Sequence, residues 1–126
     1  MTPTKILGWA APLSRLTFIA LVLLIAWLAF SPHPPKDANL GWDKANHAAA
    51  FMTLMVCAAM AWPHRLMWAA PGLIGYGGFI EIVQSFIPER DGEWADLLAD
   101  TVGIVMGLVL VFLARRALHF AFTRRE

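Results

Sequence analysis

Apolar stretches long enough to cross a lipid bilayer make up most of this chain of 126 residues. A spanning helix needs roughly 20 apolar residues, with a range of about 17–25. Four segments approach that length, at about residues 12–30, 45–62, 71–87 and 95–114. The chain is 59% hydrophobic and only 15% charged, whereas soluble domains carry about 45–50% apolar and about 25% charged residues. We therefore predict an all-α membrane protein, folded as a single four-transmembrane-helix bundle over residues 1–126.

The connections between these segments contain residues that end helices. SPHPPKDANLGWDK, which follows the first segment, holds three prolines and is predicted to be a loop. HRLM is predicted to be a tight connection, and PERDGEWAD a third loop in which Pro88 ends the third helix. Pro71 suits the first turn of that helix, where its missing N–H is not needed. No small-x-small cleavage site precedes SPHPP, so the first segment is expected to stay as an anchor.

The basic residues predict which side of the membrane each end of the chain occupies. Four spans put both termini on one side, and that side carries most of the basic residues: Lys5, Arg15, Arg65, Arg115, Arg116, Arg124 and Arg125. The opposite side carries Lys36, Lys44 and Arg90. Because basic loops stay in the cytoplasm, we expect a multi-pass protein of the cell inner (plasma) membrane with both termini cytoplasmic. The formal net charge of +1 indicates no nucleic-acid partner, and the single Cys57 allows no disulfide within the chain.

Polar residues gather at the predicted outer ends of the last three helices. Spacings of three, four and seven residues place them on one face of each helix. They are Asp43, Lys44 and His47 on the second helix, Glu81 and Gln84 on the third, Arg90 in the next loop, and Asp96, Asp100, Gly103 and Gly107 on the fourth. Three helices are thus predicted to present polar faces at a similar depth, just below the outer surface.

Two of these acids are predicted to lie inside the bilayer. Glu81 precedes the expected helix end by six residues, or roughly 9 Å at the rise of an α-helix, and Asp100 lies one turn inside its helix. An acid at mid-membrane costs about 2.5–3.5 kcal/mol, so neither side chain should face lipid, and both need polar partners. Gly103 and Gly107 form a GxxxG face that permits close approach of another helix, including that of a second copy.

Two motifs in this region resemble a known family. DKANHAAAF is similar to the D-K-x-x-H-x-x-x-F/Y opening of VanZ-like membrane proteins. EIVQSFIPERDGEWADLLADTVGIVMG resembles the family's E-x-x-Q, then Arg, then D-x-x-x-N-x-x-G-x-x-x-G. The resemblance covers about residues 42–107, and Asp100 stands where the family often has Asn. It implies a four-span fold, a polar constellation in the cell envelope, and a link to antibiotic resistance, because the family's namesake is associated with low-level teicoplanin resistance.

The polar residues divide into candidates for chemistry and candidates for binding. The candidate catalytic residues are His47, Glu81 and Asp100, since a histidine beside a carboxylate can transfer protons at neutral pH. The candidate substrate-binding residues are Asp43, Lys44, Gln84, Arg90 and Asp96. Plainer roles are also open, with Asp43 and Asp96 as helix N-caps and Arg90 as a loop anchor. Possible oxygen or nitrogen ligands of a metal are Asp43, His47, Glu81, Asp96 and Asp100. No zinc-motif spacing or G-x-S-x-G occurs, however, so neither a metal, a cofactor nor a serine nucleophile is expected.

Three functions remain open from the sequence. In the first, the pocket is an enzyme site for a lipid-linked or cell-envelope substrate, with His47 or Glu81 transferring a proton. In the second, the pocket binds a membrane lipid or a lipid-linked envelope precursor without chemistry. In the third, the polar cluster only fixes helix packing and recruits a partner protein. The expected partner is thus a membrane lipid or envelope precursor, together with a possible second copy of the chain through Gly103 and Gly107.

Overall fold

The computed structural model describes residues 3–33 and 43–124, and every regular element in these ranges is an α-helix. The helices are α1 (Pro3–Phe30), α2 (Asp43–Ala61), α3 (Leu66–Gln84) and α4 (Trp94–Thr123). The predicted all-α architecture is therefore confirmed. Most of the predicted proline-rich loop, including Lys36, lies outside the described residues, as does Arg125.

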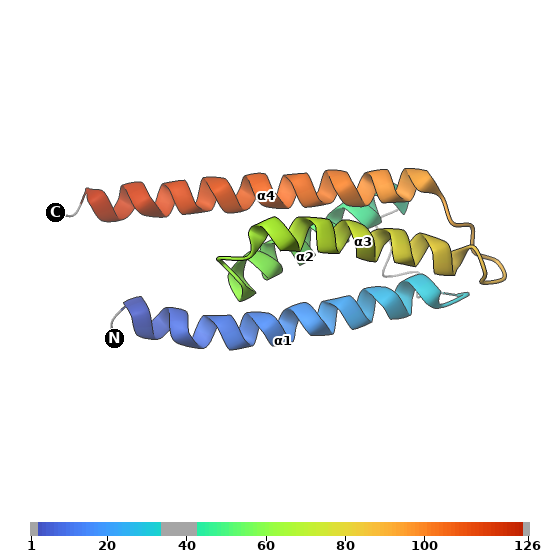
Figure 1. Cartoon of the computed structure of the whole chain (residues 1–126), viewed down its shortest axis with the longest axis horizontal. Coiled ribbons are helices and arrows are strands. Elements are labelled where there is room, and N and C mark those ends of the chain that lie inside the picture. The colour runs from blue at the N-terminus through green and yellow to red at the C-terminus, as the bar shows by residue number, and fades with distance from the viewer. Residues whose placement is uncertain (1–2, 34–42, 125–126) are drawn as a thin grey trace.

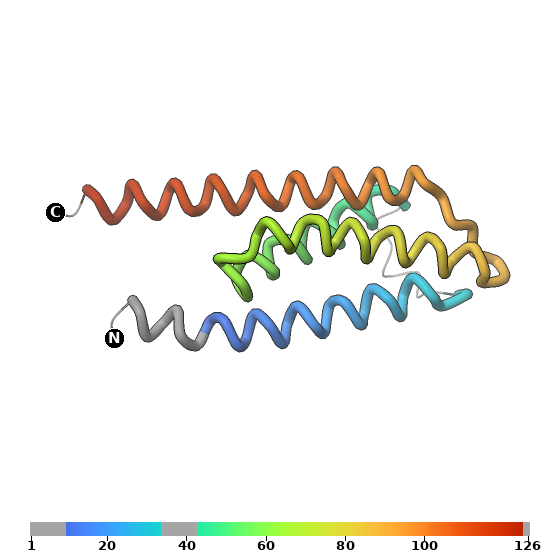
Figure 2. Tube along the Cα trace, in the orientation of Figure 1, coloured from blue at the N-terminus to red at the C-terminus, as the bar shows by residue number. Residues whose placement is uncertain are grey.

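The four helices run alternately in opposite directions along one axis (Figure 1). α2 and α3 lie between α1 and α4, and each of them packs against both outer helices. In the described part of the chain, the backbones of α1 and α4 do not approach each other. α1 begins and α4 ends at the same end of the bundle (Figure 1), and α4 extends past the α2–α3 connection there (Figure 2). This arrangement agrees with the prediction that the two termini lie on one side.

α3 begins earlier than predicted. The chain reverses between α2 and α3 in a short turn in which the Arg65 amide bonds to the Trp62 carbonyl. The Arg65 carbonyl then accepts from the Ala69 amide, which starts the helix at Leu66 within the predicted HRLM connection. Pro71 consequently lies inside α3 and not in its first turn, so the helix continues without one backbone donor.

α3 also ends earlier than predicted, at Gln84 in place of residue 87. After Ser85, the Phe86 and Ile87 amides bond to carbonyls three residues back, and the tighter turns close the helix before Pro88. Glu81 therefore precedes the helix end by three residues, or roughly 4.5 Å, half the predicted depth. It is a residue of the last helical turn, close to the start of α4.

Three helical stretches are long and apolar enough to cross a membrane: Ala10–Phe30, Leu66–Gln84 and Trp94–Thr123. α2 is outside this set because polar residues fill its first turn and alanines supply much of the rest. Its 19 residues still span about 28 Å at the α-helical rise, close to the roughly 30 Å of a hydrocarbon core. The chain is a membrane protein, and α2 is its most enclosed helix.

The apolar core is centred on α2. Phe51, Leu54 and Met55 are almost fully buried and pack with Leu73 of α3 and Ile104 of α4. Large apolar side chains on the outward faces of the other helices are exposed, including Leu23 on α1, Phe79 on α3 and Phe112 on α4. An apolar exterior of this kind is expected where lipid, and not water, surrounds the helices.

The GxxxG face of α4 packs against α2 of the same chain. A Cβ atom at Gly103 would collide with the backbone of Ala48, and one at Gly107 would lie 2.7 Å from the Met55 Cβ. The predicted close approach of another helix is therefore confirmed. Because α2 occupies this face, Gly103 and Gly107 are not available for pairing with a second copy.

Candidate functional site

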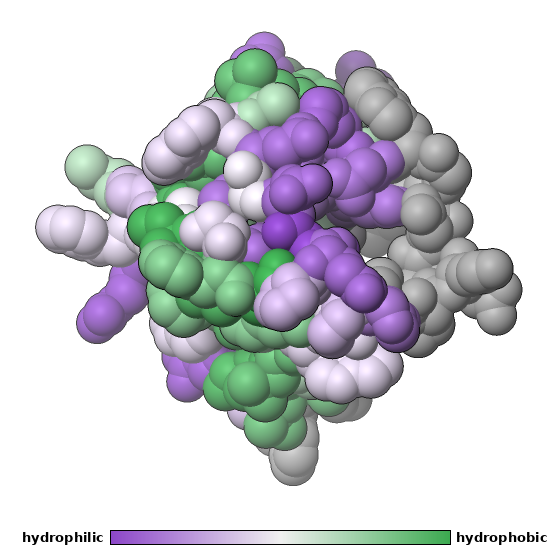
Figure 3. Space-filling view, turned by 90° about the vertical axis from the view of Figure 1, so that its right-hand side faces the viewer, coloured by the Kyte–Doolittle hydropathy of each residue, from purple (hydrophilic) through white to green (hydrophobic). Residues whose placement is uncertain are grey.

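Polar side chains gather at the end of the bundle opposite the start of α1, where α2 and α4 begin (Figure 3). They surround a pocket of about 210 Å³. The lining residues are Asp43, His47, Gln84, Glu89, Arg90, Asp91, Glu93 and Asp96. Five of the eight predicted site residues thus line one pocket. The other three, Lys44, Glu81 and Asp100, contact its lining residues from outside it.

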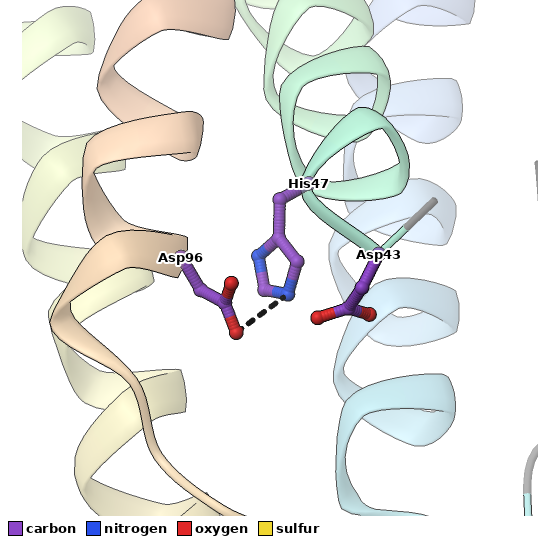
Figure 4. A group of neighbouring side chains, drawn as sticks. All are labelled: Asp43, His47 and Asp96. Carbon is purple, nitrogen blue, oxygen red and sulfur yellow. Dashed lines mark ion pairs between the residues drawn. The ribbon is translucent and has the colours of Figure 1, made fainter. Parts of the chain in front are cut away.

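His47 connects the pocket to the interior. Its Nδ1 lies 2.8 Å from Oδ1 of Asp100, and its Nε2 lies 3.6 Å from Oδ2 of Asp96. The carboxylates of Asp43 and Asp96 flank the imidazole on either side (Figure 4). The His47 side chain is 15% exposed and that of Asp100 is fully buried. The predicted histidine with a neighbouring carboxylate is therefore confirmed, and the carboxylate comes from a different helix.

Lys44 joins the start of α2 to the start of α4. Its Nζ lies 3.0 Å from Oδ1 of Asp96 and 3.0 Å from Oε2 of Glu93. Hydrogen bonds to Asp96 first, and then to Glu93, raise the pKa of Lys44 above its usual value. Lys44 therefore stays protonated throughout the physiological range, and its charge is already directed at two acids.

Glu81 contacts the N-terminus of α4. Its Oε2 accepts a 2.8 Å hydrogen bond from the backbone amide of Glu93, which precedes the first residue of the helix and has no side-chain cap. A carboxylate at a helix N-terminus is stabilised by the free amides and the helix dipole. Glu81 is only 4% exposed, as expected for an acid that must not face lipid, and its Oε1 has no hydrogen-bond partner among the described residues.

Asp100 is enclosed between α2, α3 and α4. Its Oδ1 faces His47, whereas its Oδ2 has no hydrogen-bond partner within the described ranges. Gly77 of α3 makes room for this carboxylate, since a Cβ atom there would lie 2.5 Å from Oδ2. The expectation that Asp100 does not face lipid is confirmed.

Gln84 and Arg90 hold α1 against this end of the bundle. The Gln84 side-chain amide donates to the Ala29 carbonyl at 3.0 Å. The Arg90 guanidinium donates to the Leu28 carbonyl at 2.8 Å and to the Ser31 carbonyl through two nitrogens. These bonds satisfy carbonyls that the end of α1 leaves without helical partners. The anchoring role considered for Arg90 is confirmed, and its anchor point is α1.

The role of N-cap predicted for Asp96 is wrong. The N-cap of α4 is Glu93, and Asp96 lies inside the first helical turn, where its amide bonds to the Glu93 carbonyl. Asp96 uses its carboxylate for Lys44 instead, because α2 brings the lysine alongside α4. Glu93 itself was not singled out in the sequence. The only signal for it was the density of charge in PERDGEWAD.

Histidine and carboxylate side chains form two groups that are able to hold a metal ion. Asp43, His47 and Asp96 make one group, and His47, Glu81 and Asp100 make the other. In each group, one ligand-capable atom per residue lies within 4.8 Å of the others. The first group borders the pocket, and the second lies in the interior. Both depend on contacts between helices, which a spacing motif on one helix does not reveal.

A family model described as VanZ/LLP1 matches residues 13–115. The match begins in α1, ends in α4, and contains every pocket-lining residue together with Lys44, Glu81 and Asp100. No curated protein and no solved structure shows significant similarity to the chain. The motifs around His47, Glu81 and Asp100 therefore lie within the part of the chain that carries the family likeness.

Proposed function

The chain belongs to the VanZ/LLP1 family, and we propose that its polar pocket binds the head of a membrane lipid or a lipid-linked cell-envelope precursor. The observation that carries this proposal is the position of His47, which touches a buried carboxylate on one side and lines an open pocket on the other. The pocket lies at the end of a bundle with an apolar exterior. An amphiphile can place its polar head there while its chains stay in the bilayer.

We place the pocket on the outer side of the inner (plasma) membrane. Arg15 and Arg115 donate to carbonyls of Ala61 and Pro63 at the α2–α3 connection, where Arg65 also lies. Lys44 and Arg90 lie at the pocket end. This asymmetry supports cytoplasmic termini by the positive-inside rule. In this arrangement α2 crosses the membrane as a fourth span, enclosed by the other helices. Envelope precursors on the outer leaflet then have direct access to the pocket.

The charge of the pocket favours a head that donates hydrogen bonds. Five acids line it: Asp43, Glu89, Asp91, Glu93 and Asp96. The two nearby cations are engaged within the chain, because Lys44 pairs with acids and Arg90 bonds to carbonyls of α1. Electrostatic complementarity therefore favours amine or hydroxyl groups over a bare phosphate. We propose an amine-bearing or sugar-bearing head as the ligand.

His47 is the group we assign to proton transfer. When Nδ1 carries the proton, it donates to Asp100, and Nε2 is left with a lone pair near Asp96 and the pocket. A buried carboxylate that fixes a histidine in this form prepares it to act as a general base. A hydroxyl or ammonium group of the bound head would be the proton donor. Binding and chemistry thus share one residue in this proposal.

Lipid co-purification tests the proposal directly. We would purify the wild type, His47→Ala and His64→Ala in mild detergent and identify bound lipids by mass spectrometry. His64 is an exposed histidine in the α2–α3 turn, far from the pocket, and serves as the matched control. Enrichment of one head group on the wild type and His64→Ala, with loss on His47→Ala, is expected. Equal lipid profiles for all three proteins would contradict a head-group site at His47.

The same contacts support a second candidate function, in which the cluster fixes helix packing or recruits a partner protein. Lys44, Glu81 and Arg90 each connect different helices or helix ends. If packing is the whole role, every substitution in the cluster should lower abundance and the melting temperature together. A His47→Ala protein that melts like the wild type but binds no lipid would exclude this alternative.

We further propose that head-group binding alters teicoplanin sensitivity, the phenotype that the family resemblance implies. A susceptible host expressing the wild type should tolerate more teicoplanin than one expressing His47→Ala at equal abundance. Unchanged susceptibility in both strains, with lipid binding intact, would separate the ligand from the resistance phenotype.

A further inference from the structure

Two buried carboxylate oxygens lack hydrogen-bond partners among the described residues: Oε1 of Glu81 and Oδ2 of Asp100. The residues that carry them are 4% and 0% exposed. A buried polar atom without a partner loses its hydration and gains nothing in return. Two such atoms on neighbouring acids require an explanation.

These acids also lack a matching positive charge. Glu81, Asp96 and Asp100 are all buried at this end of the bundle. Lys44 pairs with Asp96, and in residues 3–33 and 43–124 no lysine or arginine pairs with Glu81 or Asp100. Buried charges are normally paired or coordinate a metal. Apart from His47, which balances Asp100 only when it is protonated, no cation among the described residues pairs with the two acids that carry the unpartnered oxygens.

Protons or water explain only part of this arrangement. A proton on Oε1 of Glu81 or on Oδ2 of Asp100 would neutralise only one of the two buried acids. A water bridge would supply hydrogen bonds without supplying charge. A cation meets both requirements at once, because it takes oxygen lone pairs as ligands and balances the carboxylates.

His47 supplies a nitrogen ligand at the same place. One ligand-capable atom from each of His47, Glu81 and Asp100 lies within 4.8 Å of the others. The three residues come from α2, α3 and α4, and Gly77 keeps the space beside Oδ2 of Asp100 free of a side chain. Imidazole with carboxylates is a donor set that suits first-row divalent ions such as Zn²⁺ and Mn²⁺.

We propose that His47, Glu81 and Asp100 bind one first-row divalent metal ion in the interior of the bundle. The ion takes the place of the proton on Nδ1 of His47, and that proton moves to Nε2, so the coordinating imidazole stays neutral. Loading then turns Nε2 from a proton acceptor into a hydrogen-bond donor toward the pocket. The site shares His47 with the head-group pocket, whereas Glu81 and Asp100 do not line that pocket.

Metal content and melting temperature of the full chain test this proposal. The wild type, stripped with EDTA and reloaded with Zn²⁺ or Mn²⁺ alone, should retain about one ion per chain on elemental analysis and melt higher than the stripped protein. Glu81→Gln and Asp100→Asn should each weaken metal binding by about 10-fold or more. Even a substitution in the outer shell of a metal site lowers the affinity by about 10–100-fold, and these two residues are proposed as ligands. Asp43→Asn should bind like the wild type.

Three outcomes would overturn the proposal. Wild type that retains no metal and shows no melting shift excludes the site, whether or not the variants fold. Full binding by Glu81→Gln and Asp100→Asn, with loss in Asp43→Asn, assigns the ion to the pocket-side group of Asp43, His47 and Asp96 instead. Metal binding by His47→Ala that equals that of the wild type contradicts the assignment of His47 as a ligand. Loss of lipid binding with metal binding intact would defeat the head-group proposal alone.

Discussion

Asp100 of α4 and His47 of α2 meet across the helix interface, with 2.8 Å between Oδ1 and Nδ1. The two residues belong to separate motifs, 53 positions apart within the region that carries the family likeness. The contact is possible because Gly103 lets the α4 backbone approach Ala48, the residue next to His47. A GxxxG face and a buried histidine–carboxylate pair are thus parts of one interface.

Asp100→Asn should lower the stability of the bundle while leaving its shape intact. The substitution keeps the side-chain volume but replaces a charge-assisted hydrogen bond with a neutral one, a loss of about 1 kcal/mol. Thermal melting in detergent measures the change. Asp91→Asn, at an exposed loop position, is the matched control and should melt like the wild type. If the Asp100→Asn protein equals the control, the pair with His47 contributes nothing to stability.

Removing the Lys44 side chain should destabilise the protein, because the Asp96 carboxylate would lose its cation. Lys44→Met would strand the buried Asp96 carboxylate, which is 5% exposed, and breaking a buried pair on one side is strongly destabilising. The double variant Lys44→Met with Asp96→Asn should recover most of the lost melting temperature. Additive losses in the double variant would show that the two side chains act independently.

Gly103→Ala should destabilise the α2–α4 interface. Its new Cβ would collide with backbone atoms of Ala48, which cannot rotate away, and overpacking of this kind costs about 1–3 kcal/mol. Gly78→Ala in α3 is the matched control, because no atom lies within 4 Å of its added Cβ and alanine favours a helix. Melting curves that rank the two variants in the reverse order would refute the packing of α4 on α2.

The helical architecture and the depth at which polar residues gather follow from hydropathy and spacing. The shared site of Asp43, His47, Gln84, Arg90 and Asp96 could be predicted because antiparallel spans bring the outer ends of the helices to a similar depth in the membrane. The spacing of polar residues predicts which of them share one face of a helix. The short connections predict which helix ends lie side by side.

Partner atoms could not be predicted in the same way. Arg90 and Gln84 bond to carbonyls at the end of α1, and a backbone acceptor leaves no residue type to recognise in the sequence. The GxxxG face signals a close helix contact, but not whether α2 or a second copy makes it. The early end of α3 depends on a switch to tighter hydrogen bonds after Gln84, which composition does not encode.

Cysteine accessibility should report the proposed orientation and the crossing of α2. In a Cys57→Ala background, single cysteines would replace Glu89 at the pocket end and His64 in the α2–α3 turn, both exposed positions. If α2 crosses the membrane, these sites lie on opposite sides. In intact cells, a membrane-impermeant maleimide should label Glu89→Cys and spare His64→Cys until the cells are lysed. Equal labelling of both sites in intact cells would mean that α2 does not span, and labelling of His64→Cys alone would invert the bundle.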